Sequence, residues 1–250
     1  MGLRDRIATP QGKRRYVRAL FATIADRYDF ITVALSFGQD RRWKRRVIDL
    51  ARPGAATRVL DLATGTGDLA FGAADRGAPV VGLDVTYRMI ELARAKRPVS
   101  SPPAHPGPPA HPAHPALFVV GDMAALPFPA ASFEIVTTGY GLRNVPDLTV
   151  AIDEIRRVLV PGGQLLSLDF NRPSHAVVRT AYLTYLTIVG SALGWMLHRD
   201  PDTYRYIPAS IRQYPGAEGV ARMLTAGGFG DVRVHPLLGG LMTIHHAIRT

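Results

Sequence analysis

Two carboxylates and a glycine turn are spaced here as in proteins that hold a nucleoside. In VLDLATGTGDLA, residues 59–70, Asp61 closes a short apolar run, and Gly65 and Gly67 shape the turn that follows. Glycine lets the backbone approach a ligand and adopt dihedral angles that other residues avoid. Asp84 lies 19 residues after Gly65, where a carboxylate accepts both hydrogen bonds of a ribose diol. The spacing fits a dinucleotide and S-adenosylmethionine (SAM) equally, so hydride transfer and methyl transfer both stay open.

Three further features favour SAM. The DLATGTG loop resembles the D/E-x-G-x-G-x-G loop of SAM methyltransferases, with Ala63 at the first glycine position and Thr66 offering a backbone N–H and a hydroxyl. In VGDMA, Asp122 and Met123 follow a third apolar run. Methyltransferases of this architecture place an acidic residue there against the adenine amino group, and its neighbour packs on the ring. The segment ALPFPAASFE, residues 125–134, matches a run that is frequent in class I methyltransferases and absent from the dinucleotide pattern.

Alternating strand and helix patterns place these residues at the ends of strands. We expect strands at 58–62, 80–84, 117–120, 135–138 and 164–170, and helices at 67–75, 87–96 and 150–159. Such alternation predicts a parallel, doubly wound α/β sheet, which binds ligands at the carboxyl ends of its strands. A helix from Glu218 and two closing strands, the last at 241–248, complete the seven-stranded, mostly parallel sheet expected of a class I SAM-dependent methyltransferase.

Helical segments are expected to cover the site of this single predicted domain, residues 1–250. Apolar spacing from Val17 and the segment 43–50 predict helices within an N-terminal cap, residues 1–50. Residues 172–215 are expected to form a lid over the substrate, and the stretch 180–197 carries no charge. We interpret that stretch as a buried or lid helix, or as one that lines a greasy channel or rests on a membrane, in preference to a membrane span.

Composition excludes several kinds of chemistry. The absence of cysteine excludes disulfides, thiolate metal sites and the nucleophile that carbon-5 methylation of pyrimidines normally needs. The net charge of +10 fits a solvated basic surface or attraction to anionic lipid or nucleic acid. MGLRDR lacks the apolar region of a signal peptide, and we expect a cytoplasmic protein. The proline density of residues 97–116 predicts a disordered, Pro/His-rich insert without a metal or catalytic role.

Four longer segments make the resemblance specific. They are similar to signatures of the UbiE/MenG C-methyltransferases of menaquinone and ubiquinone biosynthesis: YDFITVALSFGQDRRW (28–43), GYGLRNV (139–145), RVLVPGGQLLSLDFN (157–171) and DTYRYIPASIRQYP (202–215). The resemblance covers residues 16–249 apart from the insert. Ile31, Thr32 and Asp40 depart from the family's Met, Asn and His, and Asp169 stands in place of its Glu.

The resemblance implies a site that holds SAM without a metal. It implies cofactor contacts at Thr66, Asp84, Asp122 and Met123. At a further family contact, a serine, this chain has Gly139, so only the backbone can serve there.

The implied reaction moves the methyl group of SAM to a ring carbon of a polyprenyl quinol and leaves S-adenosylhomocysteine. We expect Arg143 to stabilise the developing phenolate and Asn144 to position it, because arginine is a poor general base. The alternative is that Arg143 only holds its loop by pairing with Asp147 or Asp122. Four tyrosines are expected to pack on the quinol ring or, alternatively, in the core or lid: Tyr28, Tyr140, Tyr204 and Tyr206.

Demethylmenaquinol is the expected substrate, and the benzoquinol of the ubiquinone pathway is the alternative. A methyltransferase of sterols or natural products, an RNA methyltransferase and a non-enzymatic membrane protein are less favoured, and we expect no nucleic-acid partner. A polyprenyl tail implies peripheral contact with the inner face of the cell membrane. Basic residues between Arg4 and Arg18 and the stretch 180–197 are expected to provide that contact. A homodimer is a further expectation.

Overall fold

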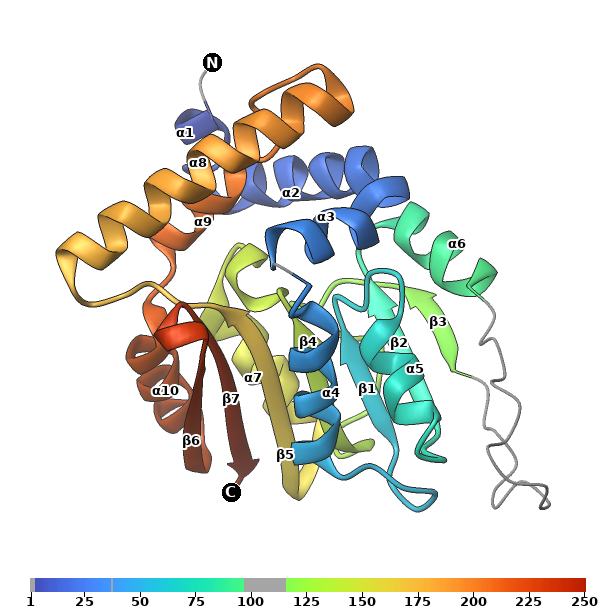
Figure 1. Cartoon of the computed structure of the whole chain (residues 1–250). Helices are drawn as coiled ribbons and strands as arrows, with labels where there is room; N and C mark the ends of the chain where they lie inside the picture. The colour runs from blue at the N-terminus through green and yellow to red at the C-terminus, as the bar shows by residue number, and fades with distance from the viewer. Residues whose placement is uncertain (1–2, 37, 97–115) are drawn as a thin grey trace.

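A seven-stranded sheet forms the middle of the protein in the computed structural model, which describes residues 3–36, 38–96 and 116–250 (Figure 1). The strands run in the order β3-β2-β1-β4-β5-β7-β6. The pairs among β1 to β5 are parallel, and β7 runs antiparallel to β5 and β6. This arrangement confirms the expected fold class. The strand bounds are β1 Val59–Leu62, β2 Val80–Asp84, β3 Leu117–Val120, β4 Phe133–Gly139, β5 Leu159–Phe170, β6 Phe229–Leu237 and β7 Met242–Arg249.

Helices cover both faces of the sheet and give the protein two cores. One face packs against α4 (Asp40–Ala51), α5 (Asp68–Ala74) and α6 (Tyr87–Ala95), and the other against α7 (Leu148–Val158) and α10 (Gly216–Ala226). Side chains alternate along a strand. Leu60 and Leu62 therefore join the core under α7 and α10, while Val59 joins the core under α4 and α5.

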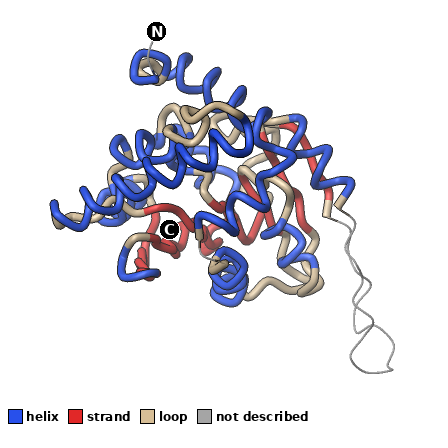
Figure 2. Tube along the Cα trace, turned by 45° about the horizontal axis from the view of Figure 1, so that its top comes forward, coloured by secondary structure: helices blue, strands red, loops and turns tan. Residues whose placement is uncertain are grey.

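A layer of helices lies over the carboxyl ends of the parallel strands (Figures 1 and 2). It comprises α1 Leu3–Arg6, α2 Pro10–Ile24, α3 Tyr28–Leu35, α8 Ala176–His198 and α9 Tyr206–Gln213. Residues from the predicted cap and lid share two apolar clusters. Tyr206 packs with Val17, and Tyr204 packs with Ile24 and Ile31. The two segments thus form one layer, whose role as cap and lid stays a prediction.

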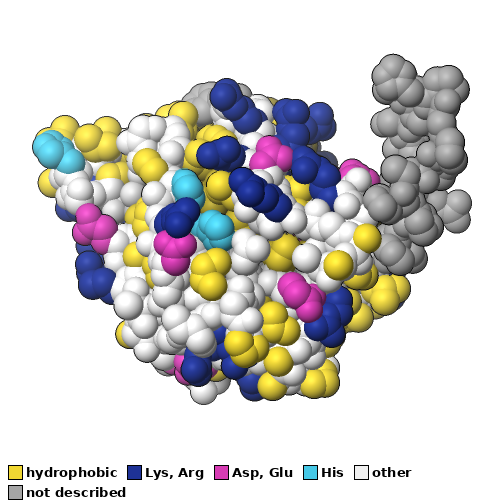
Figure 3. Space-filling view, turned by 90° about the horizontal axis from the view of Figure 1, so that it is seen from below, with side chains coloured by type: hydrophobic (Ala, Val, Ile, Leu, Met, Phe, Trp, Pro, Cys, Tyr) yellow, Lys and Arg dark blue, Asp and Glu magenta, His cyan; other side chains and the backbone are white. Residues whose placement is uncertain are grey.

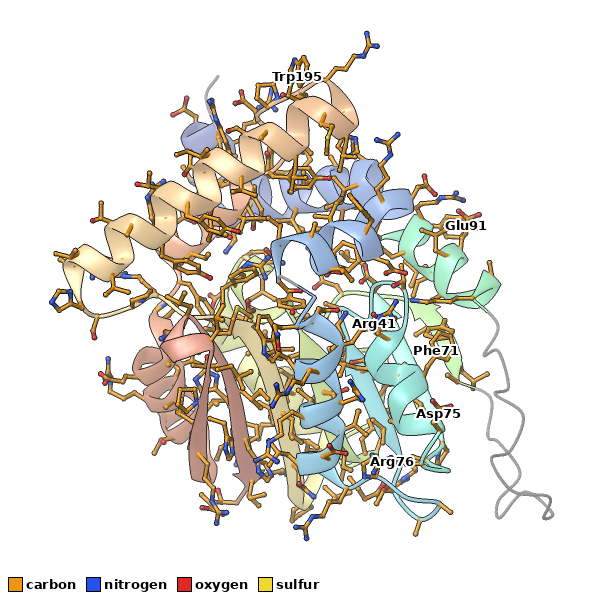
Figure 4. All side chains as sticks on the ribbon, in the orientation of Figure 1. Arg41, Phe71, Asp75, Arg76, Glu91 and Trp195 are labelled. Atoms are coloured by element: carbon orange, nitrogen blue, oxygen red, sulfur yellow. The ribbon has the colours of Figure 1, made fainter. Side chains whose placement is uncertain are left out.

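The helix α8 has two faces of different character. Its buried residues, Tyr182, Leu183 and Leu186 among them, point into the protein, while Ile188 and Trp195 are more than 60% exposed. In Figure 4, Trp195 lies on the side of α8 away from the sheet. By length and composition, α8 could cross a membrane, and it is the one such helix in the described ranges. Its buried face packs on this domain, as expected for a lid helix.

Several local predictions differ from the structure. The N-terminal helix is broken by the 3-10 turn η1, Ala25–Arg27, and α9 was not predicted. Strand β5 begins five residues earlier than predicted, at Leu159, which pairs with Phe133. The register shifts before Gln164 pairs with Ile135, and Gly162 has φ of 77° within this irregular segment. Of the expected insert 97–116, all but Ala116 lies outside the described residues.

The face opposite α8 presents mixed charge. In Figure 3, Lys and Arg side chains lie there in separate groups, with acidic and histidine side chains among them.

Candidate active site

Two cavities meet beneath the helical layer, at the carboxyl ends of β1, β2 and β4. The larger has a volume of about 560 Å³ and is lined by residues of α2, α3, α8 and α9 together with Arg143 and Phe170. The smaller, about 80 Å³, lies among the loops that follow β1 to β4. Three aromatic side chains line both cavities: Phe21, Tyr28 and Tyr140. They form a wall that the two cavities share, and molecules bound in the two cavities would approach each other at this wall.

Five of the predicted cofactor residues line the smaller cavity: Gly65, Asp84, Asp122, Met123 and Gly139. The Asp84 carboxylate accepts the Gly65 N–H at 3.0 Å and the Thr86 N–H at 2.8 Å. Burial raises its pKa, although these two hydrogen bonds oppose the shift. The carboxylate is thereby held rigidly at the end of β2 and keeps unused acceptor capacity for a diol.

The remaining three, Asp61, Thr66 and Gly67, lie outside the lining of that cavity and hold its loop. Asp61 accepts the hydroxyls of Thr64 at 2.6 Å and Thr137 at 2.8 Å, and burial raises its pKa to about 6. Gly67 begins α5 with φ of 90°, and a Cβ there would meet the Phe71 ring at 2.8 Å. Asp61 and Thr66 instead line a third cavity of about 20 Å³, and direct contact of these three residues with the cofactor stays a prediction.

A residue of α2 closes over the smaller cavity. Arg14 forms an ion pair with the Oδ2 atom of Asp122, whose Oδ1 atom accepts the Ala124 N–H at 2.9 Å. Arg14 itself lines the cavity. The N-terminal segment is predicted to form a cap and, through its basic residues, to contact the membrane. The ion pair of Arg14 at the cofactor pocket is a contact that the motifs did not indicate.

Arg143 is the charged side chain among the residues that line the larger cavity. Its Nη1 atom donates to Asp169 Oδ1 and to the Tyr140 carbonyl, each at 2.9 Å, and its backbone N–H donates to Asp169 Oδ2. Burial works against its charge, but the Asp169 carboxylate outweighs this and raises the pKa. The predicted alternative partners were wrong: Asp147 instead caps α7, and Asp122 pairs with Arg14.

Asn144 lies on the other side of the wall. Its Nδ2 atom donates to the Tyr140 carbonyl at 2.7 Å, and the residue lines the smaller cavity rather than the larger one. Its Oδ1 atom is buried without a hydrogen-bond partner. We predicted Asn144 beside the phenolate, but the structure places it beside the cofactor residues, because consecutive residues of the 3-10 turn η2 (Leu142–Asn144) point in different directions.

The four predicted tyrosines all line the larger cavity. Tyr204 Oη lies 2.9 Å from His198 Nε2, and the buried Tyr206 hydroxyl has no partner. Tyr140 Oη donates to Asp40 Oδ1 at 2.6 Å. The motifs marked Asp40 and Asp169 only as departures from the family pattern. Their partners across the fold could not be read from the sequence.

The smaller cavity is lined by the hydrogen-bond acceptors and the apolar surface that suit SAM. Asp84 suits a ribose diol, Asp122 suits an amino group, Met123 offers an apolar surface, and the unpartnered Asn144 oxygen accepts a further hydrogen bond. Among residues 3–36, 38–96 and 116–250, no three His, Cys, Asp or Glu side chains gather as a metal site. The expectation of a reaction without a metal stays a prediction.

Residues 9–249 match the ubiE/COQ5 methyltransferase family. The chain belongs to this family. It is 40% identical over 228 residues to a demethylmenaquinone methyltransferase of Thermus thermophilus, covering 90% of this chain and 98% of the relative. It is 34% identical over 240 residues to a ubiquinone/menaquinone biosynthesis C-methyltransferase of Saccharophagus degradans, covering 95% of this chain and 92% of the relative. The resemblance inferred from the motifs is confirmed.

Solved structures show the same fold. A SAM-dependent methyltransferase of Thermotoga maritima aligns with a TM-score of 0.64 and 15% identity, covering 94% of this chain and all of that one. A putative methyltransferase of Haloferax volcanii, in complex with its Trm112 activator, aligns with a TM-score of 0.60 and 16% identity, covering 91% and 96%. The chain is therefore a class I methyltransferase, and SAM is its cofactor.

Replacing Asp84 with alanine should weaken SAM binding. The carboxylate lines the smaller cavity, and hydrogen bonds to a charged group contribute about 1.5–3 kcal/mol each, so we expect an affinity loss of about 10- to 100-fold. Isothermal titration with SAM measures it. The matched control is Asp75→Ala, an exposed carboxylate at the end of α5 (Figure 4), which should bind SAM as the wild type does. Equal affinities for the two variants would contradict the assignment.

Proposed function

We propose that this protein transfers the methyl group of SAM to a ring carbon of a polyprenyl quinol, with demethylmenaquinol as the substrate. One observation carries the proposal. A large cavity with apolar walls contains the single guanidinium of Arg143 and shares an aromatic wall with the cofactor cavity. An apolar ring bearing one ionisable hydroxyl fits such a space. The names of the relatives support menaquinone over ubiquinone, since the relative from Thermus thermophilus is called a demethylmenaquinone methyltransferase.

The protein's task is to make an aromatic carbon nucleophilic. SAM supplies an already activated methyl group when it is bound. Arg143 would stabilise the oxygen of the ionised quinol, so that its electrons flow into the ring. The apolar walls exclude water and strengthen that interaction. Asp169 keeps the guanidinium in place, because a buried arginine without a carboxylate would be strongly destabilised.

Labelled SAM and reduced demethylmenaquinone test the proposal directly. We expect methylated naphthoquinol as the product, at a kcat/KM at least 10-fold higher than for the demethylated benzoquinol of the ubiquinone pathway. The measurement is radiolabel in the extracted lipid, with the oxidised quinone as control. Because the oxidised quinone has no hydroxyl to ionise, it should accept no label. A preference for the benzoquinol would establish the alternative substrate, and transfer to neither would overturn the proposal.

Arg143→Lys should slow methyl transfer and leave SAM binding intact. Lysine keeps a charge opposite Asp169, but it lacks the planar guanidinium, whose Nη1 atom donates to Asp169 and to the Tyr140 carbonyl while its other N–H groups stay available to the quinol oxygen. We expect kcat to fall about 10- to 100-fold, since removing one preorganised donor costs this much or more. The matched control is Arg76→Lys. Arg76 forms an exposed ion pair with Asp49 (Figure 4), so this variant should keep the kcat of the wild type. Wild-type kcat in Arg143→Lys and in Arg143→Ala would contradict the electrostatic role.

The outer face of α8 is the proposed contact with the membrane. Ile188, Trp195 and Met196 are all more than half exposed on it, and α2 adds exposed Arg15 and Arg18 in the same helical layer. Apolar side chains at the level of the headgroups and basic side chains against anionic lipids both favour binding. Such a position would bring the larger cavity close to the lipid from which a polyprenyl substrate must come.

Trp195→Ser should weaken binding to anionic vesicles. We expect the wild-type protein to float with anionic vesicles at low salt and to be released at high salt, and Trp195→Ser to float severalfold less, because it loses a large exposed apolar side chain. Tyr87→Ser on α6 removes a comparably exposed aromatic residue away from α8 and should float as the wild type does. Equal recovery of the wild type in the supernatant with and without anionic vesicles would overturn the membrane contact.

A further inference from the structure

Methylation of the quinol ring leaves a proton that the larger cavity cannot solvate. Replacing a ring C–H by C–CH₃ releases one proton overall, and the quinol O–H bond must break before the ring attacks. The walls of the cavity are mainly apolar, and an isolated charge is costly in such surroundings. If the protein methylates a quinol as proposed above, it needs a polar route from this cavity to solvent.

A continuous series of polar contacts begins at the wall between the two cavities. Tyr140 Oη donates to Asp40 Oδ1 at 2.6 Å, and Asp40 is buried. Lys44 Nζ lies 2.7 Å from Asp40 Oδ2 and 2.9 Å from Asp68 Oδ2. Asp68 in turn lies 2.5 Å from the Nζ atom of Lys96. Exposure of the side chains rises along this series, from Asp40 at 2% to Lys96 at 39%, so its far end meets water.

The near end of the series faces the site. Tyr140 lines both cavities, and so it lies where the quinol ring and the methyl donor must meet. Ser36, whose hydroxyl accepts the Asp40 N–H, also lines the larger cavity. Of the two side chains that contact the Asp40 carboxylate, Tyr140 lines the larger cavity and Lys44 leads away from it.

We propose that Tyr140 and Asp40 form the relay that removes the quinol's proton. The quinol O–H bond breaks and its proton passes to Tyr140 Oη, while the proton that Tyr140 held passes to Asp40, which becomes a carboxylic acid. The electron pair of the broken bond stays on the quinol oxygen, opposite Arg143, and flows into the ring. Lys44 then gives a proton to Asp68 as it takes one from Asp40, and Asp68 releases that proton to water, which restores the resting state. After methyl transfer, the proton on the methylated ring carbon leaves that carbon and the quinol oxygen takes up a proton, so one proton is released overall. Tyr140 is the catalytic residue of the pair, and Asp40 acts through it.

The charges around the relay suit this role. Burial and the neighbouring Asp40 raise the pKa of Tyr140 well above its usual value, so that it passes a proton on and does not hold a negative charge. Tyr28 lines the same wall, and burial raises its pKa to about 12, but among the described residues it is the Tyr140 hydroxyl that donates to Asp40. Asp68 raises the pKa of Lys44 despite its burial, so Lys44 rests as a cation. These groups and Arg143 are the ones that face Asp40 and Tyr140.

A second tyrosine pair lines the larger cavity and is the rival route. Tyr204 Oη lies 2.9 Å from His198 Nε2, and His198 is partly exposed. Tyr204 lines the larger cavity only, whereas Tyr140 lines both. Because the ionised oxygen belongs to the ring that meets the methyl group, the position of Tyr140 favours the first route.

Asp40→Asn and Tyr140→Phe test the relay. Asparagine still accepts a hydrogen bond from Tyr140 but cannot take its proton, and phenylalanine keeps the aromatic wall. We expect kcat for demethylmenaquinol to fall about 100-fold in each, with KM and SAM affinity unchanged. The double variant should be no slower than either single variant, because the two residues act in one step. The deficit should shrink as pH rises from 7 to 9, since the quinol then ionises unaided; a merely structural defect would not recover.

Matched controls separate the outcomes. Asp49→Asn makes the same change at an exposed residue of the same helix, and Tyr214→Phe removes a buried, unpartnered hydroxyl outside both cavities; both should turn over as the wild type does. A normal kcat in Asp40→Asn would overturn the relay, and so would a loss of kcat seen only in Tyr204→Phe and His198→Asn. In either case, methylation by the wild type would still support the proposed function. A wild type that methylates no quinol would overturn both.

Discussion

At the end of β4 the chain turns through a left-handed residue, Tyr140, and the arrangement of the whole site depends on how that turn is held. Tyr140 has φ of 61°, a conformation that is strained for a residue with a side chain. Its N–H donates to the Leu168 carbonyl, and its carbonyl accepts both Arg143 and Asn144. Its hydroxyl donates to Asp40. These four hydrogen bonds offset the strain and send Arg143 and Asn144 to opposite sides of one aromatic wall.

The same turn explains why two charged pairs lie buried beside an apolar cavity. One pair is Arg143 with Asp169, and the other is Asp40 with Lys44. The charged groups of both pairs are removed from water, and each group is held in place by its partner. Buried ion pairs contribute little net stability, but the loss of one partner is costly, so each pair keeps its members in place. The charges thus stand at the edge of a space that otherwise suits a ring and a polyprenyl tail. In this arrangement α4 supplies Asp40 and Lys44, β5 supplies Asp169, and the site is complete only when the helix and the sheet are packed together.

The sequence predicted the parts of this protein that follow local rules. Alternating strands and helices predicted the sheet, and the spacing of Gly65, Asp84 and Asp122 predicted residues that line one cavity. Motif membership does not say which cavity a side chain lines, so the sequence could not separate Asp61 and Thr66, which line a third cavity, from Gly65 and Asp84. The partner of Arg143 could not be predicted either, since Asp169 lies 26 residues away and meets it only through the pairing of β4 with β5. For the same reason Asp40, 100 residues from Tyr140, appeared only as a departure from a pattern.

The central claim is that the wall of Phe21, Tyr28 and Tyr140 separates a cofactor cavity from a quinol cavity. A crystal structure with S-adenosylhomocysteine and demethylmenaquinone tests it most directly. We expect the adenosyl group between Asp84 and Asp122, the quinone ring on the far side of Tyr140 with an oxygen near Arg143, and the tail beneath α8. A quinone ring bound outside the larger cavity, or with its oxygens remote from Arg143, would show that this cavity is not the quinol site.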